Sequence, residues 1–347
     1  MNIDALKTRI LFLLKNRDFQ ILLGILILAF ILRLWVFVKT LGQPLWYDEA
    51  AYFSYAKTIL GQEVNYPLNP RRPFFMPLLW VGVSLFGGEE AASRFLVVII
   101  SMFGVLFTYL IGKEMYNKRV GWMAAFMMSV FWIHLFFTGR LLTGLIATTF
   151  IVASVYFFWK GYVKKDNFKM VGLAGLFFGL AVFTRAASVL MVLPYAFFFL
   201  TKERLGFLKK KSFWSFVGMS VLAVVPFILW LFLSYENPVG SFTGVGEGRF
   251  STFTLETLLT GNTWSFVSFF PTYLQLPYLA LFVIGLGLFL SLLLGLDYLF
   301  KKEGAEIRKK LFLLIWIVVF LVFFGMATSQ SYMEPRYLMY IFPAVFI

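Results

Sequence analysis

Long apolar stretches recur along this sequence, and most of them are long enough to cross a lipid bilayer. They fall near residues 19–38, 95–112, 120–137, 141–159, 170–184, 186–201, 212–235, 277–300 and 311–333. A helix needs about 20 apolar residues to cross a hydrocarbon core of roughly 30 Å, and the bilayer admits only structures that satisfy their own backbone hydrogen bonds. We therefore expect an all-α, polytopic transmembrane helical bundle with about nine complete spans.

A last apolar run starts at Tyr337 and reaches residue 347 after about half the length of a span. It predicts a truncated tenth helix, and so a single transmembrane domain over 1–347 that is shortened at its C-terminus. The composition agrees, since only 14% of the residues are charged, against roughly 25% in soluble domains. The chain has no Cys and a single His, His134, which excludes thiolate and multi-histidine metal sites. We expect His134 to be a packed structural residue.

The positions of Lys and Arg predict the topology. If the short apolar run 74–86 does not span, the N-terminus and four loops on the same side of the membrane hold 21 of the 31 Lys and Arg residues. Such an excess is typical of the cytoplasmic side, so we expect a cytoplasmic N-terminus in a multi-pass cell-membrane protein. The net charge of +14 then reflects this loop bias, and no nucleic-acid partner is expected.

The same topology leaves two large segments on the extracytoplasmic side. The first outer loop, 42–91, is expected to carry two amphipathic interfacial helices, 48–60 and 74–86. In the first of them Tyr52, Tyr55 and Ile59 recur at helical spacing, and Gly61 suits its C-terminal cap. The second large outer loop covers 236–276. Because the inner loops are short, we expect a functional site on the outer face.

Two adjacent carboxylates, Asp48 and Glu49, stand where the first apolar run has just emerged into water. One interpretation is that they are acids of a first helical turn, favoured by the helix dipole. The other is a catalytic base beside a substrate that the membrane delivers. Successive helix positions point about 100° apart, so the two are not expected to share a proton. If one is catalytic, the other orients it or binds substrate.

Three arginines, Arg336, Arg140 and Arg185, are expected at the level of the outer leaflet. The planar guanidinium can donate two hydrogen bonds at once to a phosphate, so the three predict an anion site if the helices bring them together. The alternative for Arg336 is an interfacial residue whose charge reaches water, or one that simply pairs with Glu334.

The order of these short motifs resembles the C-type glycosyltransferases of the protein O-mannosyltransferase and aminoarabinose-transferase kind. The matching segments are 32–35, 44–50 with its Asp-Glu pair, 87–94, 112–121, 139–141 and 336–338, while 72–74 stands where the family often has His-Pro-Pro. The resemblance implies an enzyme that moves a sugar from a polyprenyl-phosphate donor (dolichyl- or undecaprenyl-phosphate) to an acceptor protein, lipid or glycan on the extracytoplasmic face, with inversion.

By this resemblance Asp48 is the general base, Glu49 assists it, and the arginines stabilise the departing lipid phosphate. The full set of implied site residues is Asp48 and Glu49 as catalytic residues, Arg336, Arg140 and Arg185 on the donor phosphate, and Tyr52, Arg72, Glu334 and Tyr337 as weaker substrate-binding candidates.

Two departures from the family pattern bear on this interpretation. The acidic residue that often follows the Gly-Arg motif is missing from 141–145, so a divalent cation is not supported and no cofactor is expected. Arg72 replaces the histidine of His-Pro-Pro, so the role of that histidine does not transfer. Two alternatives stay open: a lipid or solute transporter or flippase, for which Arg33 is the one candidate charge near mid-span, and a non-catalytic membrane scaffold.

Overall fold

The computed structural model describes residues 15–62, 84, 90–234, 272–273, 279–280, 283, 304–327 and 334–347. Within these residues every regular element is a helix, as the sequence predicts. The first half comprises α2 (Arg17–Thr40), α3 (Tyr47–Ile59), α5 (Glu90–Met115), α6 (Lys118–Val130), α7 (Trp132–Thr138), α8 (Thr143–Phe158) and the π-helical turn η1 (Trp159–Lys165). The second half comprises α9 (Phe168–Thr184), η2 (Ala186–Met191), α10 (Val192–Glu203), η3 (Arg204–Lys209), α11 (Lys211–Ser234), α15 (Gly304–Ala327), η6 (Pro335–Leu338) and α16 (Phe342–Phe346).

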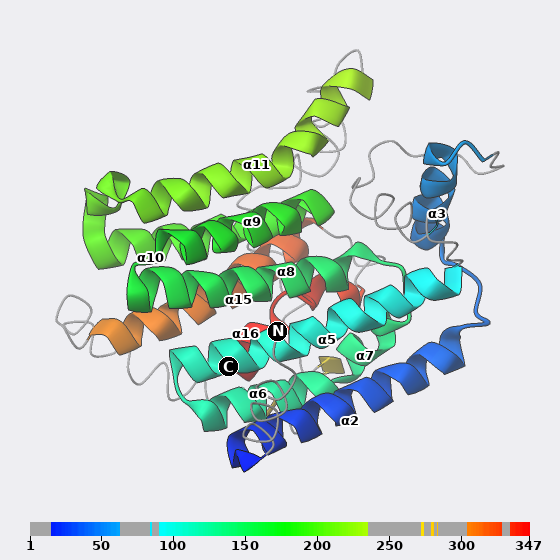
Figure 1. The fold of residues 1–347 in the computed structure, drawn as a ribbon, viewed down its shortest axis with the longest axis horizontal. Helices are drawn as coiled ribbons and strands as arrows, with labels where there is room; N and C mark the ends of the chain where they lie inside the picture. The colour runs from blue at the N-terminus through cyan, green and yellow to red at the C-terminus, as the bar shows by residue number, and fades with distance from the viewer. Residues whose placement is uncertain are drawn as a thin grey trace, which may run out of the picture.

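The long helices lie side by side and run back and forth across the molecule (Figure 1). α11 packs on α9, α9 on α8, α8 on α5, and α5 on both α6 and α2. α15 packs against α10 and α16 on the other side of this row. Consecutive helices such as α5 and α6 run antiparallel because the connections between them, for example 116–117 and 166–167, are too short for any other arrangement.

Among the described residues, five helical segments are long and apolar enough to cross a membrane: Arg17–Thr40, Glu90–Met115, Thr143–Lys165, Ala186–Lys209 and Gly304–Met326. A sixth span results if α6 and α7, which meet at an angle of 56°, are counted together. The chain is therefore a helical multi-pass membrane protein. The described part holds fewer spans than the nine expected, because Phe168–Thr184 and Lys211–Pro226 are shorter apolar helices and 277–300 lies almost entirely outside the described residues.

The final apolar run does not form one helix from Tyr337 onward. A 3-10 turn, η6, is followed by a turn over 339–341 and then by the short helix α16. Pro343 stands at the start of α16, and a proline ring is tolerated only in the first turn of a helix. A continuous helix from Tyr337 through this proline is thus disfavoured, and Arg336 lies in η6 instead of at the start of a membrane helix.

The first outer loop begins as predicted. α3 covers Tyr47–Ile59, and Gly61 adopts a left-handed conformation with φ of 73° just beyond its end, where glycine avoids the steric penalty of a side chain. The expected second interfacial helix, 74–86, and the outer loop 236–276 lie outside the described residues, apart from 84 and 272–273.

Candidate active site

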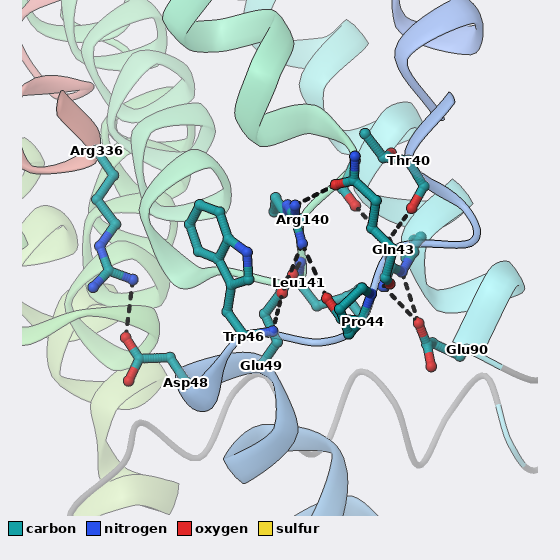
Figure 2. Close-up of polar contacts among 12 residues, drawn as sticks. Thr40, Gln43, Pro44, Trp46, Asp48, Glu49, Glu90, Arg140, Leu141 and Arg336 are labelled. Carbon is teal, nitrogen blue, oxygen red and sulfur yellow. Dashed lines mark hydrogen bonds and ion pairs between the residues drawn. The ribbon is translucent and has the colours of Figure 1, made fainter. Parts of the chain in front are cut away.

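One end of the helical row brings together four segments that are far apart in the sequence (Figures 1 and 2). They are the turn after α2 with the start of α3, the start of α5, the turn between α7 and α8, and η6. Figure 2 shows that Asp48 and Glu49 point to different partners: Asp48 points to Arg336, and Glu49 points to the turn between α7 and α8. This agrees with the expectation that adjacent helix positions diverge.

Glu49 is fully buried, and both of its carboxylate oxygens accept hydrogen bonds. The Leu141 backbone N–H donates to Oε1 at 2.6 Å, and the Trp46 N–H donates to Oε2 at 2.8 Å. Arg140 Nη1 adds a charged contact to Oε2 at 3.4 Å. A buried carboxylate needs such partners, and the bond to Trp46 also satisfies an N–H at the start of α3. Glu49 thus ties α3 to the α7–α8 turn and is out of reach of a substrate.

Arg140 uses most of its hydrogen-bonding capacity within the protein. Besides Glu49, it donates to the Pro44 carbonyl at 3.3 Å and to the Gln43 side chain. Its guanidinium lies over the Trp46 ring, 4.3 Å from the ring centre. Burial lowers the pKa of Arg140 and the neighbouring Glu49 carboxylate opposes this. Arg140 is 4% exposed, and its contacts hold the turn between α7 and α8 against the segment that leads into α3.

A second buried arginine, Arg94 on α5, was not among the predicted site residues. It donates to the Thr40 carbonyl and the Gln43 carbonyl, both at 2.9 Å, and forms an ion pair with Glu90 at 2.7 Å. It therefore holds the turn that leads from α2 to α3. The sequence carried one signal for it: Glu90 and Arg94 have the four-residue spacing at which helical side chains meet.

Asp48 and Arg336 form the second polar pair of the site. Arg336 Nη1 donates to Asp48 Oδ2 at 2.9 Å, and Arg336 Nε lies 2.6 Å from Glu334 Oε2. The two side chains keep 24% (Asp48) and 14% (Arg336) of their surface exposed. Burial alone lowers the pKa of Arg336, but Tyr337, Glu334 and Asp48 outweigh it and the net pKa is raised. This pair is accessible, unlike buried Glu49 with its bonds to Trp46, Arg140 and Leu141, which we call the Glu49 clamp.

Arg185 follows α9 and has a different environment. Its guanidinium faces the rings of Tyr337, Phe324 and Tyr340 at 5.1, 5.7 and 5.8 Å from the ring centres. Within the described part of the chain no carboxylate pairs with it. The hydroxyls of Tyr340 and Ser188 are buried and lie close to each other. Arg185 is thus a cation held by aromatic faces, with the buried hydroxyl groups of Tyr340 and Ser188 nearby.

Gly144 shows how close Arg185 lies to the backbone of η6, the turn that carries Arg336. A Cβ atom added at Gly144 would lie 3.2 Å from Arg185 Nη1, 3.6 Å from the Arg336 carbonyl oxygen and 2.7 Å from the Met339 side chain. The start of α8, Arg185 and η6 therefore converge at one point. A side chain there would have to displace the ends of the Met339 and Arg185 side chains.

The remaining predicted site residues fall in three groups. Glu334 and Tyr337 contact Arg336 or Arg185 directly. Tyr52 is buried in α3 and belongs to the packed core. Arg72 lies outside the described residues. His134 is buried and takes no part in the site. Over the same described ranges, no group of three His, Asp or Glu residues is arranged to hold a metal ion.

Comparison with known proteins shows which family model and which folds this chain resembles. Residues 69–230 match the family model described as dolichyl-phosphate-mannose-protein mannosyltransferase. No curated protein matches the sequence at a comparable level of significance. The matched segment runs from before α5 into α11 and includes Arg94, Arg140 and Arg185.

Solved structures share the fold over nearly the whole chain. ArnT from Cupriavidus metallidurans bound to undecaprenyl phosphate superposes with a TM-score of 0.65 at 16% identity, covering 94% of this chain and 58% of ArnT. The Archaeoglobus fulgidus oligosaccharyltransferase tethered to an acceptor peptide gives a TM-score of 0.55 at 16% identity, covering 93% of this chain and 48% of that one. The oligosaccharyltransferase AglB from Archaeoglobus fulgidus, in complex with an inhibitory peptide and a dolichol-phosphate, gives a TM-score of 0.56 at 14% identity, covering 93% of this chain and 49% of that one.

These matches confirm the resemblance predicted from the ordered motifs. The fold is the one seen in ArnT and in the archaeal oligosaccharyltransferase, and residues 69–230 resemble the mannosyltransferase family. The chain spans 58% of the length of the ArnT structure and about half the length of the archaeal enzymes.

Proposed function

We propose that this protein is a membrane glycosyltransferase that moves a sugar from a polyprenyl-phosphate donor to a hydroxyl-bearing acceptor. The observation that carries the proposal is the placement of Asp48, Arg336 and Arg185. An accessible carboxylate is bonded to one arginine, and a second arginine without a carboxylate partner in the described part of the chain lies beside the same segment, η6. A base next to paired phosphate ligands suits attack on a sugar whose leaving group is a phosphate.

In this proposal Asp48 is the general base. It removes the proton of the acceptor hydroxyl while the hydroxyl oxygen forms a bond to the anomeric carbon. The bond between that carbon and the phosphate oxygen breaks, and the lipid phosphate departs with the bonding electrons. One displacement of this kind inverts the anomeric centre. A carboxylate next to the reacting carbon also stabilises the positive charge that develops on the sugar ring.

Arg185 and Arg336 are assigned to the phosphate of the donor. Arg185 is the stronger of the two, because the charge of Arg336 is shared with Asp48 and Glu334. A phosphate that engages Arg336 replaces Asp48 as its partner, and this leaves Asp48 available to accept a proton. The buried hydroxyls of Tyr340 and Ser188 supply further donors near Arg185.

Glu49 and Arg140 receive a different assignment from the one that the resemblance implies. Both are buried and bonded to each other and to the backbone, so we assign them to positioning the start of α3 instead of to contact with substrate. Because α3 begins at Tyr47, the Glu49 clamp fixes the helical turn that presents Asp48.

The expected topology places this site on the extracytoplasmic face, with the N-terminus in the cytoplasm. The start of α6 with Lys118 lies at the end of the helical row opposite to the turn between α7 and α8, and this agrees with a basic cytoplasmic side. The acceptor, whether protein, lipid or glycan, then approaches from outside while the donor lipid remains in the bilayer.

The test is transfer in membranes that contain the full-length protein, with the wild type beside Asp48→Asn. A panel of labelled polyprenyl-phosphate sugars is supplied with candidate acceptors, and release of free lipid phosphate is followed. Asparagine has nearly the size of aspartate but does not accept the proton, so turnover is expected to fall by about 100-fold or more. Equal turnover in both proteins would show that Asp48 is not the base, and no turnover of any donor would contradict the transferase itself.

A further inference from the structure

Arg33 is a fully buried arginine within the membrane helix α2. It precedes the end of that helix by seven residues, which corresponds to about 10 Å along the axis. A charged side chain at such a depth is costly unless its environment compensates the charge, and it is therefore a marker of function or of a specific structural need. Within the described ranges no carboxylate pairs with Arg33.

Neutral acceptors satisfy all the N–H groups of the Arg33 guanidinium. Two contacts stay near α2 and α5: Nη1 donates to the Ala29 carbonyl at 3.0 Å, and Nε donates to the Ser101 hydroxyl at 2.9 Å. The other three reach the α6–α7 region. They are the Ser129 carbonyl at 3.2 Å, the Met128 carbonyl at 3.3 Å and His134 Nδ1 at 2.8 Å. A guanidinium has five N–H groups and no acceptor, so its capacity is completely used.

These three contacts lie on both sides of a break in the helix. α6 ends at Val130, Phe131 is extended with ψ of 119°, and α7 starts at Trp132. The two helices meet at 56°. Met128 and Ser129 belong to the last turn of α6, whose carbonyls lose their helical partners at the break. Arg33 supplies those partners from another helix, and its positive charge complements the carbonyl end of the α6 dipole.

The contact with His134 reaches the other side of the break. Because the guanidinium only donates, His134 Nδ1 is the acceptor, and a neutral His134 then carries its proton on Nε2. His134 lies on α7. Arg33 therefore fixes the end of α6 and the start of α7 at the same time.

The two helices that Arg33 links are those whose ends build the Glu49 clamp. α2 ends at Thr40 and leads through Gln43 to α3. α7 ends at Thr138 and leads directly to Arg140 and Leu141, which bond to Glu49. The direction of α7 beyond the break thus sets where the clamp lies relative to the end of α2.

We propose that Arg33 is a positioning residue of the transferase site: by holding the α6–α7 break open at its observed angle, it places the clamp that orients Asp48. This inference rests on the proposed function for its kinetic part only. The structural part concerns the angle of α7 relative to α2 and can be measured whether or not the protein transfers a sugar.

The structural test uses spin labels on introduced cysteines, because the chain has no Cys of its own. The reporting pair is Leu41→Cys and Phe136→Cys, two exposed positions at the end of α2 and on α7. The control pair is Trp35→Cys and Phe126→Cys, exposed positions on α2 and on α6 before the break. In the full chain in nanodiscs, Arg33→Gln is expected to shift or broaden the distance distribution of the reporting pair and to leave the control pair unchanged.

The kinetic test compares Arg33→Gln, Arg33→Lys and Ser101→Ala. Misplaced catalytic groups lower kcat by about 10- to 100-fold, so we expect that loss in Arg33→Gln, with the donor KM within about threefold of wild type because Arg33 touches no phosphate ligand. Lysine keeps the charge but carries its donors on one atom, so Arg33→Lys is also expected to shift the reporting pair and to lose turnover. Ser101→Ala removes the bond to α5 alone and is expected to keep wild-type label distances and kcat.

The outcomes separate the proposals. Unchanged reporting-pair distances in both Arg33 variants, equal changes in the two label pairs, or full rescue by lysine would each overturn the positioning role. If Arg33→Gln does not accumulate in the membrane, the lysine variant decides the question. If wild type transfers no sugar, the proposed function fails, and the label distances still decide whether Arg33 sets the angle of α7.

Discussion

Asp48 and Arg336 are 288 residues apart in the sequence, and Arg336 donates a hydrogen bond to Asp48 at 2.9 Å. The arginine has a second carboxylate partner, Glu334, two residues before it. The ion pair joins the start of α3 to η6. In the proposed reaction it also joins the base, Asp48, to a ligand of the leaving group, Arg336. Asp48 and the donor phosphate therefore compete for Arg336.

This competition predicts tighter binding of polyprenyl phosphate by Asp48→Asn. Partly exposed ion pairs contribute about 0.2–1 kcal/mol, so the affinity of the freed Arg336 for phosphate is expected to rise by about two- to fivefold. Titration of a short-chain polyprenyl phosphate into nanodiscs at fixed salt measures it. Asp166→Asn, which removes the same charge from an exposed position at the opposite end, is the control. Weaker binding by Asp48→Asn than by this control would show that the pair does not compete with the donor.

The assignment of Arg185 predicts a selective loss of donor binding. Hydrogen bonds to charged groups contribute about 1.5–3 kcal/mol, so Arg185→Ala is expected to weaken polyprenyl-phosphate binding by about 10- to 100-fold. Arg119→Ala removes the same charge from an exposed position at the start of α6. This variant is expected to bind polyprenyl phosphate as wild type does. The same titration measures both variants. Equal losses in the two would mean that net charge, and not Arg185 itself, attracts the phosphate.

The Glu49 clamp predicts a loss of stability from a change of a few atoms. In Glu49→Gln an amide group replaces one carboxylate oxygen and meets an N–H donor, and Arg140 loses its buried counter-charge. Breaking a buried pair in this way costs about 3–5 kcal/mol. We expect a clearly lower midpoint of thermal unfolding in detergent. Glu114→Gln breaks the exposed pair with Lys164 and should cost less than about 1 kcal/mol; a similar shift in both would contradict the clamp.

Close contact between Gly139 and Thr40 predicts that a single methyl group disturbs the site. A Cβ atom at Gly139 would lie 2.3 Å from Thr40 Oγ1, whereas a Cβ atom at Gly42 would meet nothing within 4 Å. Gly139→Ala is expected to destabilise the protein by about 1–3 kcal/mol and to lower transfer, while Gly42→Ala leaves both near wild type. Adding Thr40→Ala to Gly139→Ala removes the clash, so partial recovery is expected. No recovery would mean that the effect arises elsewhere.

Much of the local structure follows from the sequence alone. Apolar length and periodicity predict the helices, and Gly61 marks the end of α3, because these features depend on near neighbours in the chain. The divergence of Asp48 and Glu49 follows from helix geometry. The burial of His134 was also predicted correctly, since an aromatic-rich apolar helix offers it few other environments.

The pairing of the arginines could not be predicted in the same way. Arg140 and Arg185 occupy similar short turns in the sequence, yet Arg140 is bonded to Glu49 and Arg185 faces aromatic rings. Their difference depends on residues from α3 and η6, which only the tertiary fold brings near.

The break at Phe131 carries no local signal either. No proline or glycine stands at 130–132, and the apolar run reads as one straight helix. The carbonyls freed by the break are bonded by Arg33, about 100 positions earlier in the chain. The residues near 131 in the sequence therefore do not reveal that the helix breaks there.

The distance in sequence between Asp48 and Arg336 has a consequence for biogenesis. Ribosomes add about 5–20 residues per second, so Asp48 waits about 15 to 60 s for a partner that is made 288 residues later. Glu49, by contrast, meets Arg140 after 91 residues. The nascent chain therefore completes the buried clamp early and the accessible pair late, and a ribosome that stalls between these points leaves a membrane-inserted protein whose proposed base has no arginine beside it.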